Sequence, residues 1–109
     1  MSTEEKGISL LPFPFSDLTQ AKRRPALFIS VLEGDDMIFC QITSKATSDH
    51  YAILLENEDF EMGGLKQPIN VRPNRIFTAD SHIVLYKVGQ LKVNKLNSII
   101  EKVIEIIRR

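Results

Sequence analysis

The sequence predicts a small α+β domain, mainly β, in which a curled antiparallel sheet or small barrel is followed by one C-terminal helix. Short β-prone apolar runs, separated by Gly, Pro and acidic turn residues, recur from residue 7 to residue 88. Over residues 96–107 the apolar period changes to three- and four-residue steps. The 109 residues, 43% of them hydrophobic, suffice for one core, so residues 1–109 are expected to form a single domain.

The first three predicted strands lie in the N-terminal half of the chain. The first covers residues 7–13 and runs into a Pro-Phe-Pro-Phe sequence, whose prolines cannot donate hydrogen bonds to a neighbouring strand. A loop is expected over residues 16–24. Residues 25–31 and 37–42 are apolar and β-prone, and the turn-forming sequence Glu33-Gly-Asp-Asp36 between them predicts a β-hairpin.

Shorter β-prone segments follow, which brings the expected total to five or six strands. The strands are residues 51–55, residues 67–71 and residues 82–88, and residues 75–78 are a short additional piece. The pair Gly63-Gly64 predicts a tight turn before the second of these segments. Arg72-Pro73 is expected to interrupt the sheet after it, and Gly89 is expected to end the last strand.

The C-terminal segment has the pattern of an amphipathic helix. Its apolar side chains recur at helical spacing, and they are Leu96, Ile99, Ile100, Val103, Ile104 and Ile107. The opposite face carries Lys95, Glu101, Lys102 and Glu105. Because an apolar stripe of this kind must be covered, we expect the helix to pack on the sheet.

Several classes of protein are excluded by what the sequence lacks. The longest nearly apolar run, residues 25–32, is far shorter than the roughly 20 residues that span a bilayer, so no membrane association is expected. The N-terminus begins with acids and has no signal-peptide pattern, and the single cysteine forms no internal disulfide, so a cytoplasmic location is expected. The P-loop, dinucleotide-binding and H-E-x-x-H motifs are absent.

Neither a metal nor a cofactor is expected from the titratable residues. The two histidines, His50 and His82, have no Cys or His neighbour at metal-ligand spacing. A ribonuclease with paired histidines stays open if the two converge in space. Cys40 lies between Phe39 and Gln41 without a basic neighbour, which predicts a buried small hydrophobe and not a nucleophile.

A cationic cluster at the end of the predicted hairpin is the strongest candidate site. The 14 basic and 14 acidic residues balance, but Lys22, Arg23 and Arg24 stand together immediately before an apolar strand. Packing of that strand would fix the Arg24 backbone, so its guanidinium could be directed at a phosphate. The partner strand ends in Thr43-Ser44-Lys45, and hairpin pairing brings Thr43 to the same end as Arg24. The pattern predicts a phosphate cradle; an ordinary hairpin with charged ends is the alternative.

A series of short motifs resembles the MazF/PemK family of toxins over nearly the whole chain. The motifs are residues 11–18 (LPFPFSDL), residues 23–30 (RRPALFIS), residues 41–44 (QITS), residues 63–65 (GGL), residues 71–78 (VRPNRIFT) and residues 87–91 (KVGQL). Their order and spacing are more specific than any one of them. The resemblance implies an SH3-like antiparallel β-barrel with a C-terminal α-helix, in agreement with the elements expected from the sequence.

The resemblance also implies an activity: a sequence-specific, metal-independent endoribonuclease toxin of a type II toxin–antitoxin pair. Such a protein acts as a homodimer on single-stranded RNA (mRNA), is silenced by a cognate antitoxin protein, and is not expected to bind DNA by itself. In the family the ribose 2′-OH attacks the adjacent phosphate and leaves 2′,3′-cyclic phosphate and 5′-OH ends without a cofactor. The implied catalytic residues are Arg24 and Thr43.

Supporting RNA contacts are expected from the segments on either side of this pair. They are Phe15, Ser16, Asp17, Thr19, Gln20, Lys22, Arg23, Ser44 and Lys45. The cations would attract phosphates and the ring of Phe15 would stack on a base. Asp17 is the carboxylate among them and is a candidate general base. The alternative function is a non-catalytic SH3-like module that binds RNA or a protein through the same basic face.

Overall fold

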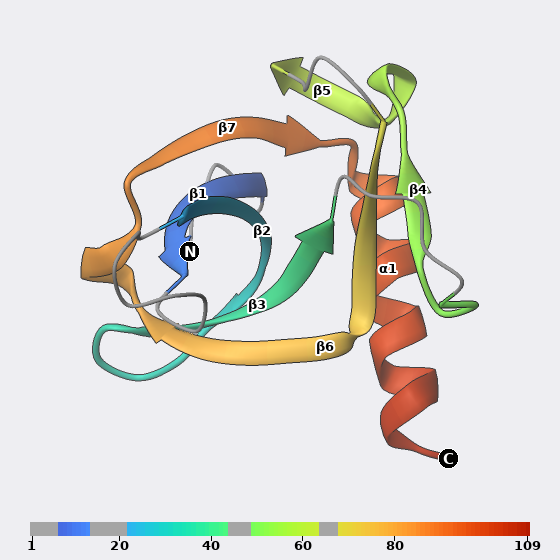
Figure 1. Cartoon of the computed structure of the whole chain (residues 1–109). Coiled ribbons are helices and arrows are strands. Elements are labelled where there is room, and N and C mark those ends of the chain that lie inside the picture. The colour runs from blue at the N-terminus through green and yellow to red at the C-terminus, as the bar shows by residue number, and fades with distance from the viewer. Residues whose placement is uncertain (1–6, 14–21, 44–48, 64–67) are drawn as a thin grey trace.

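The computed structural model describes residues 7–13, 22–43, 49–63 and 68–109 (Figure 1). The strands are β1 (Gly7–Phe13), β2 (Lys22–Val31), β3 (Asp36–Thr43), β4 (Ile53–Leu55), β5 (Phe60–Gly63), β6 (Ile69–Asp80) and β7 (Tyr86–Leu91). The helix is α1 (Val93–Ile107), and two 3-10 turns are η2 (Asn57–Asp59) and η3 (Ser81–Ile83). The predicted mainly β architecture with one C-terminal helix is confirmed, with seven strands in place of five or six.

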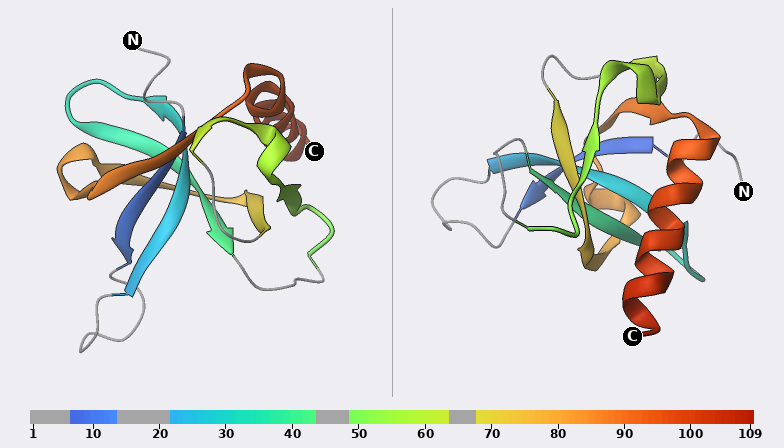
Figure 2. Two further views of the ribbon diagram at one scale, coloured as in Figure 1. Left: turned by 90° about the horizontal axis from the view of Figure 1, so that it is seen from above. Right: turned by 90° about the vertical axis from the view of Figure 1, so that its right-hand side faces the viewer.

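The strands form one curled sheet in the order β4-β6-β3-β2-β1-β7-β5. Every paired neighbour is antiparallel. The sheet closes on itself as an incomplete barrel, and α1 stands along one side of it next to β4 and β6 (Figures 1 and 2). The curl brings β1, β2, β3 and β6 together as four successive strands, and these strands carry the candidate site.

The predicted β2–β3 hairpin is confirmed, with an earlier start. Its turn contains Gly34 at a φ of 77°, a conformation that glycine adopts without steric cost. The backbone N–H of Leu32 donates to the carbonyl oxygen of Asp36 at 2.9 Å. The predicted end of the preceding loop, at residue 24, was wrong. The strand β2 already begins at Lys22, which pairs with Phe13 of β1. Pairing with β1 therefore extends β2 toward its N-terminus, beyond the apolar residues.

The interruption predicted at Arg72-Pro73 was also wrong, because β6 continues through it. The ladder with β3 shifts from Cys40 opposite Ile76 to Gln41 opposite Arg72. Residues 73–75 therefore form a bulge, where Pro73 does not have to donate a hydrogen bond to β3. The bulge lets one strand bend around the barrel where the sequence suggested two separate pieces.

The last strand starts later than the predicted residues 82–88 and does not end at Gly89. Residues 81–83 form η3, and β7 runs from Tyr86 through Gly89 to Leu91. Gly89 pairs with Gly63 of β5, and the close approach of the two backbones requires glycine at Gly63, where an added Cβ would lie 2.6 Å from the carbonyl oxygen of Val88. Gly63 itself ends β5, a strand that the sequence did not predict, at a φ of 71°.

The predicted helix is confirmed, and it covers the main core. Leu96, Ile99 and Val103 are its buried residues. They join a cluster that includes Ile8, Leu27, Cys40, Ile42, Val71 and Leu91. The C-terminal part of the predicted apolar stripe stays exposed, with Ile107 at 65%. No helix in the described part of the chain has the length and apolar character needed to cross a membrane.

A second, aromatic cluster lies on the other face of β2 and β3. Ala26, Phe28 and Phe39 are completely buried there. The ring of Phe39 meets Phe28 edge to face at 6.1 Å between centroids and stacks on Phe77 of β6 at 5.6 Å. Strand alternation separates this cluster from the helix-covered core, to which Leu27 and Cys40 belong. The candidate site continues the aromatic face.

The thiol of Cys40 should be inert in the folded protein. The residue is completely buried, as predicted, and burial raises the pKa of its thiol to about 12. At pH 8 the thiolate fraction is then on the order of a thousandfold lower than in an unfolded chain with a pKa near 8.5. We expect no reaction with a chromogenic aromatic disulfide until the protein is denatured. A rapid colour change in native buffer would contradict this burial.

Candidate functional site

Arg24 and Thr43 lie at the same end of two adjacent strands. The last pair of the β2–β3 ladder joins Ala26 to Gln41, and the two candidate residues lie two positions beyond it on β2 and β3. Arg24 is exposed and Thr43 is half-buried. Arg24 also pairs with β1, and Thr43 pairs with Asn70 of β6. Each residue is therefore held by ladder pairing on the side away from the other.

The two side chains belong to one face of the sheet. Directly paired residues of antiparallel strands point to the same face, and so do residues an even number of positions apart. Phe28 pairs with Phe39. Arg24 precedes Phe28 by an even number of positions, and Thr43 follows Phe39 by an even number of positions. The β2–β3 pairing has no register shift from Phe28 toward this end of the hairpin. A guanidinium and a hydroxyl thus extend the aromatic face at the open end of the hairpin.

The hairpin is electrically polarised along its length. Residues 18–32 and 37–48 contain several Lys and Arg but no Asp or Glu. The opposite end carries Glu33, Asp35 and Asp36 in the turn, next to Asp80 of β6. At about 3.3 Å per residue the two ends of β2, a strand of 10 residues, are about 30 Å apart. A polyanion is therefore attracted to the end with Arg24 and repelled from the turn.

An ion pair lies beside Thr43 on the next strand. Arg72 of β6 is opposite Gln41 in the ladder, so it shares the face of Thr43. Its Nε and Nη2 both donate to Oδ2 of Asp49 at 3.2 Å. Oδ1 of Asp49 accepts the backbone N–H of Tyr51 at 3.0 Å. The side chains of Arg72 and Asp49 are only 24% and 11% exposed.

These contacts lower the pKa of Asp49. The backbone N–H of Tyr51 contributes most; the side chains of Arg72 and Asn74 act in the same direction, while partial burial opposes them. Because the folded-state pKa is below the unfolded value near 3.9, the stabilisation is present at neutral pH. It is lost as the pH falls through the folded-state pKa, below about 4.

The other predicted RNA contacts are mostly beyond what the structure describes. Phe15, Ser16, Asp17, Thr19, Gln20, Ser44 and Lys45 lie outside the described residues. Lys22 and Arg23 form the start of β2, opposite Phe13 and Pro12 of β1. Both therefore belong to the strand that carries Arg24, and not to the loop in which the sequence placed them.

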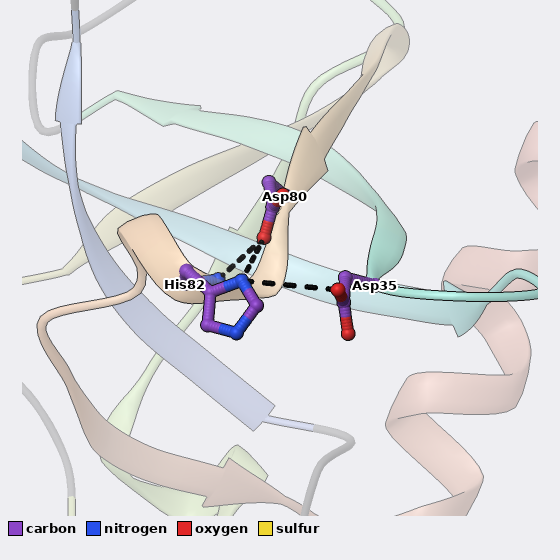
Figure 3. A group of neighbouring side chains, drawn as sticks. All are labelled: Asp35, Asp80 and His82. Carbon is purple, nitrogen blue, oxygen red and sulfur yellow. Dashed lines mark hydrogen bonds and ion pairs between the residues drawn. The ribbon is translucent and has the colours of Figure 1, made fainter.

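The two histidines have separate surroundings. The ring of His50 lies against the ring of Tyr51, tilted by 35°, with 4.3 Å between the centroids. His82 belongs to η3 and contacts two carboxylates near the turn of the hairpin (Figure 3). His50 follows Asp49 in the turn before β4, whereas His82 lies at the acidic end of the hairpin. The described residues therefore give no support to a paired-histidine ribonuclease.

The carboxylates around His82 form a cluster that sequence analysis missed. Nδ1 of His82 is 2.7 Å from Oδ1 of Asp80 and 4.0 Å from Oδ2 of Asp35 (Figure 3). The backbone N–H of Ser81 donates to the carbonyl oxygen of Asp35 at 2.8 Å and so joins the two turns. The ligand atoms of the three side chains lie within 4.8 Å of one another, a spacing compatible with a metal ion.

This cluster stands apart from the candidate site. The Asp80 carboxylate also accepts a hydrogen bond from the backbone N–H of His82. This bond is the main reason that the pKa of Asp80 is lowered; the contact with the His82 ring lowers it less, and burial opposes both effects. All three side chains are exposed, and they lie at the acidic end of the hairpin. Hydrogen bonds within the cluster account for the arrangement, so we assign it no part in the chemistry of Arg24 and Thr43.

The arrangement of motifs and strands is that of a known family. A family model described as PemK-like, MazF-like toxin of type II toxin-antitoxin system matches residues 5–107. The chain belongs to this family. The resemblance inferred from the short motifs is thereby confirmed, and the C-terminal helix lies within the match. None of the curated proteins matches the sequence.

Solved structures of two MazF toxins and of an endoribonuclease have the same fold. The Mycobacterium tuberculosis toxin MazF-mt6 superposes with a TM-score of 0.71 at 16% identity, covering 94% of this chain and 96% of that chain. MazF from Deinococcus radiodurans has a TM-score of 0.71 at 20% identity, with 95% and 94% covered. An endoribonuclease in complex with its cognate antitoxin, from a mycobacterial species, has a TM-score of 0.67 at 11% identity, with 94% and 91% covered. The expected barrel with a C-terminal helix is confirmed.

Proposed function

We propose that this PemK/MazF-family protein is a sequence-specific endoribonuclease toxin that cuts single-stranded RNA without a metal ion. The observation that carries the proposal is the register of the β2–β3 hairpin, which leaves Arg24 and Thr43 at one end and on one face of adjacent strands. The absence of acids from the neighbouring sequence, residues 18–32 and 37–48, favours a polyanionic substrate at this end.

The reaction is an internal transfer of the phosphodiester. The ribose 2′-oxygen forms a bond to phosphorus while the bond from phosphorus to the 5′-oxygen breaks, which leaves a 2′,3′-cyclic phosphate and a 5′-OH. Negative charge grows on the non-bridging oxygens as the fifth bond forms. Arg24 binds these oxygens through its planar guanidinium, and the Thr43 hydroxyl donates a hydrogen bond to them. Both residues lower the barrier by stabilising charge that develops in the transition state.

Two proton transfers complete the reaction. A base takes the 2′-OH proton, and the departing 5′-oxygen receives a proton from an acid or from water. A guanidinium is a poor base at neutral pH, so Arg24 serves as the electrostatic group. Asp17 is our candidate base, because it is the carboxylate in the segment that precedes Arg24.

Two protein partners belong to the proposal. The first is a second copy of the chain, since a domain of 12.4 kDa has a modest core that a dimer interface would supplement. The second is a cognate antitoxin: one mycobacterial structural neighbour is described in complex with its own. Sedimentation that shows a single species of 12.4 kDa at micromolar concentration would exclude the homodimer.

The decisive experiment is incubation of the purified protein with a long single-stranded RNA in excess EDTA. Discrete cuts with 5′-OH ends are expected, and end mapping would identify the recognition sequence. EDTA removes contaminating metal nucleases and also any ion held by Asp35, Asp80 and His82. If the folded protein binds RNA but creates no new ends, the non-catalytic binding module replaces the enzyme.

Removal of the Thr43 hydroxyl tests its role as a hydrogen-bond donor. Thr43→Val keeps the shape of the side chain, and we expect the cleavage rate to fall about a hundredfold, since one transition-state donor is lost. Thr43→Ser retains the hydroxyl and should retain most of the activity. Single-turnover cleavage of the mapped RNA measures both. Equal rates for the Val variant and the parent would remove Thr43 from the catalytic pair.

A further inference from the structure

A strip of side chains crosses the sheet from the proposed catalytic pair to the sheet edge formed by β4. Thr43 of β3 pairs with Asn70 of β6, and Asn70 pairs on its other side with Leu54 of β4. Directly paired residues of antiparallel strands point to the same face. Asn70 and Leu54 therefore share the face of Thr43 and Arg24. The strip ends at Leu54, because β4 is the last strand on this side of the strand order.

The burial of the neighbouring residues confirms that this face lies outside the main core. Ile69 and Val71, on either side of Asn70, are buried in the cluster that α1 covers. Asn70 itself is half-buried, and Leu54 is 46% exposed. Both side chains therefore lie on the surface that carries the proposed catalytic pair, where a ligand can reach them.

The chemistry of the strip changes in the same order as the parts of a nucleotide. The Arg24 guanidinium and the Thr43 hydroxyl suit a phosphate. The neutral amide of Asn70 comes next, and its oxygen and NH₂ group can form paired hydrogen bonds with the edge of a base. Leu54 comes last and offers hydrocarbon to the face of that base. Neighbouring strands are about 4.8 Å apart, so the strip extends about 10 Å beyond Thr43, within reach of a base whose phosphate is bound there.

The Asn70 amide is free to bind such a base. No side-chain hydrogen bond among the described residues uses it. Arg72, the next residue of β6 on this face, is by contrast occupied: its Nε and Nη2 both donate to Asp49 at 3.2 Å. The Asp49 carboxylate repels a phosphate, so the surface beside Asn70 is better suited to an uncharged part of RNA.

We propose that Asn70 is a specificity-determining residue whose amide binds the edge of the base next to the cleaved phosphate, while Leu54 packs on the face of that base. The inference rests on the proposed function, because the phosphate bound by Arg24 and Thr43 sets which base reaches Asn70. Unstacked bases of single-stranded RNA expose their hydrogen-bonding edges, so a side-chain amide can distinguish them. Neither Asn70 nor Leu54 touches the reacting atoms, and cleavage should continue without the amide.

The test compares the cut sites of the parent and of two Asn70 variants on one long single-stranded RNA in excess EDTA. In Asn70→Ala the preference for one base, at a single position next to the cut, should fall about tenfold while other positions keep theirs. Asn70→Asp has acceptors only, so its preference at that position should move toward a base with an amino donor, such as cytosine. Preference is a ratio of rates at different sites, so a change in overall rate cancels. Unchanged preference at every position in both variants would overturn the proposal.

Leu54→Ala tests the apolar contact, and two further variants are matched controls. We expect Leu54→Ala to lower kcat/KM for the mapped RNA about tenfold. Ile76 is 44% exposed but pairs with Cys40, so it lies on the opposite face, and Ile76→Ala should cut at the parental rate. Asn97→Ala removes an exposed amide of α1 and should keep the parental preference. An equal loss of preference in Asn97→Ala and Asn70→Ala would contradict a direct contact with the base.

Binding without cleavage separates this inference from the proposed function. RNA with fluorine in place of every 2′-OH lacks the attacking oxygen and cannot undergo the internal transfer. From a randomised library of such RNA the parent should select one base at one position, and Asn70→Ala should lose that selection. A parent that cuts no RNA but shows this loss would refute only the proposed function. Equal selection by the parent and Asn70→Ala would refute the role of Asn70, whether or not the parent cuts RNA.

Discussion

Arg24→Ala is expected to lower RNA cleavage about a thousandfold and to leave the fold intact. The guanidinium is the one charged group that the proposal places on the reacting phosphate, and loss of even a neutral donor to such oxygens costs about a hundredfold to a thousandfold. Arg24 is exposed at the end of β2, so its truncation should change the free energy of unfolding by less than about 0.5 kcal/mol. Single-turnover cleavage and thermal unfolding measure the two effects separately.

Two further variants serve as controls for Arg24→Ala. Arg24→Lys keeps the positive charge but lacks the planar two-donor geometry, and its rate should fall between those of the parent and Arg24→Ala. Arg108→Ala removes an exposed arginine at the C-cap of α1, outside the strands that carry Arg24 and Thr43, and should cut RNA at the parental rate. Cleavage by Arg24→Ala as fast as the parent would show that the reaction takes place elsewhere.

Phe39→Ala should be the most destabilising single truncation in the sheet, at about 3–5 kcal/mol. The ring is completely buried and lies between Phe28 and Phe77, so its removal leaves a cavity that β-strand backbones cannot collapse into. Domains of this kind are stable by about 5–15 kcal/mol in total, so the variant should approach unfolding at ambient temperature.

Thermal unfolding at constant protein concentration would measure this loss as a decrease in Tm of about 15 °C or more. Tyr86→Ala is the matched control, because Tyr86 is an aromatic residue of β7 that is 55% exposed. Its truncation should cost about 0.5 kcal/mol. A loss below about 1 kcal/mol for Phe39→Ala would mean that the aromatic cluster does not hold β2, β3 and β6 together.

Local chemistry explains why much of the fold could be predicted from the sequence. The β2–β3 hairpin follows from two apolar runs and a Gly-containing acidic turn, and α1 follows from the spacing of residues such as Leu96, Ile99 and Val103. These signals act within a few residues of one another. Predictions failed where a distant strand decided the outcome: β1 extends β2 to Lys22, and β3 carries β6 past Pro73.

The sequence alone also determined the family, because ordered motifs such as residues 23–30 and 71–78 can be recognised without the structure. It also indicated Arg24 and Thr43 as candidate site residues. The tertiary structure alone decided which side chains meet across long separations. Asp49 finds Arg72, and His82 finds Asp35, through the curl of the sheet. Such contacts depend on register and strand order, which the packing of the whole core sets and no local spacing encodes.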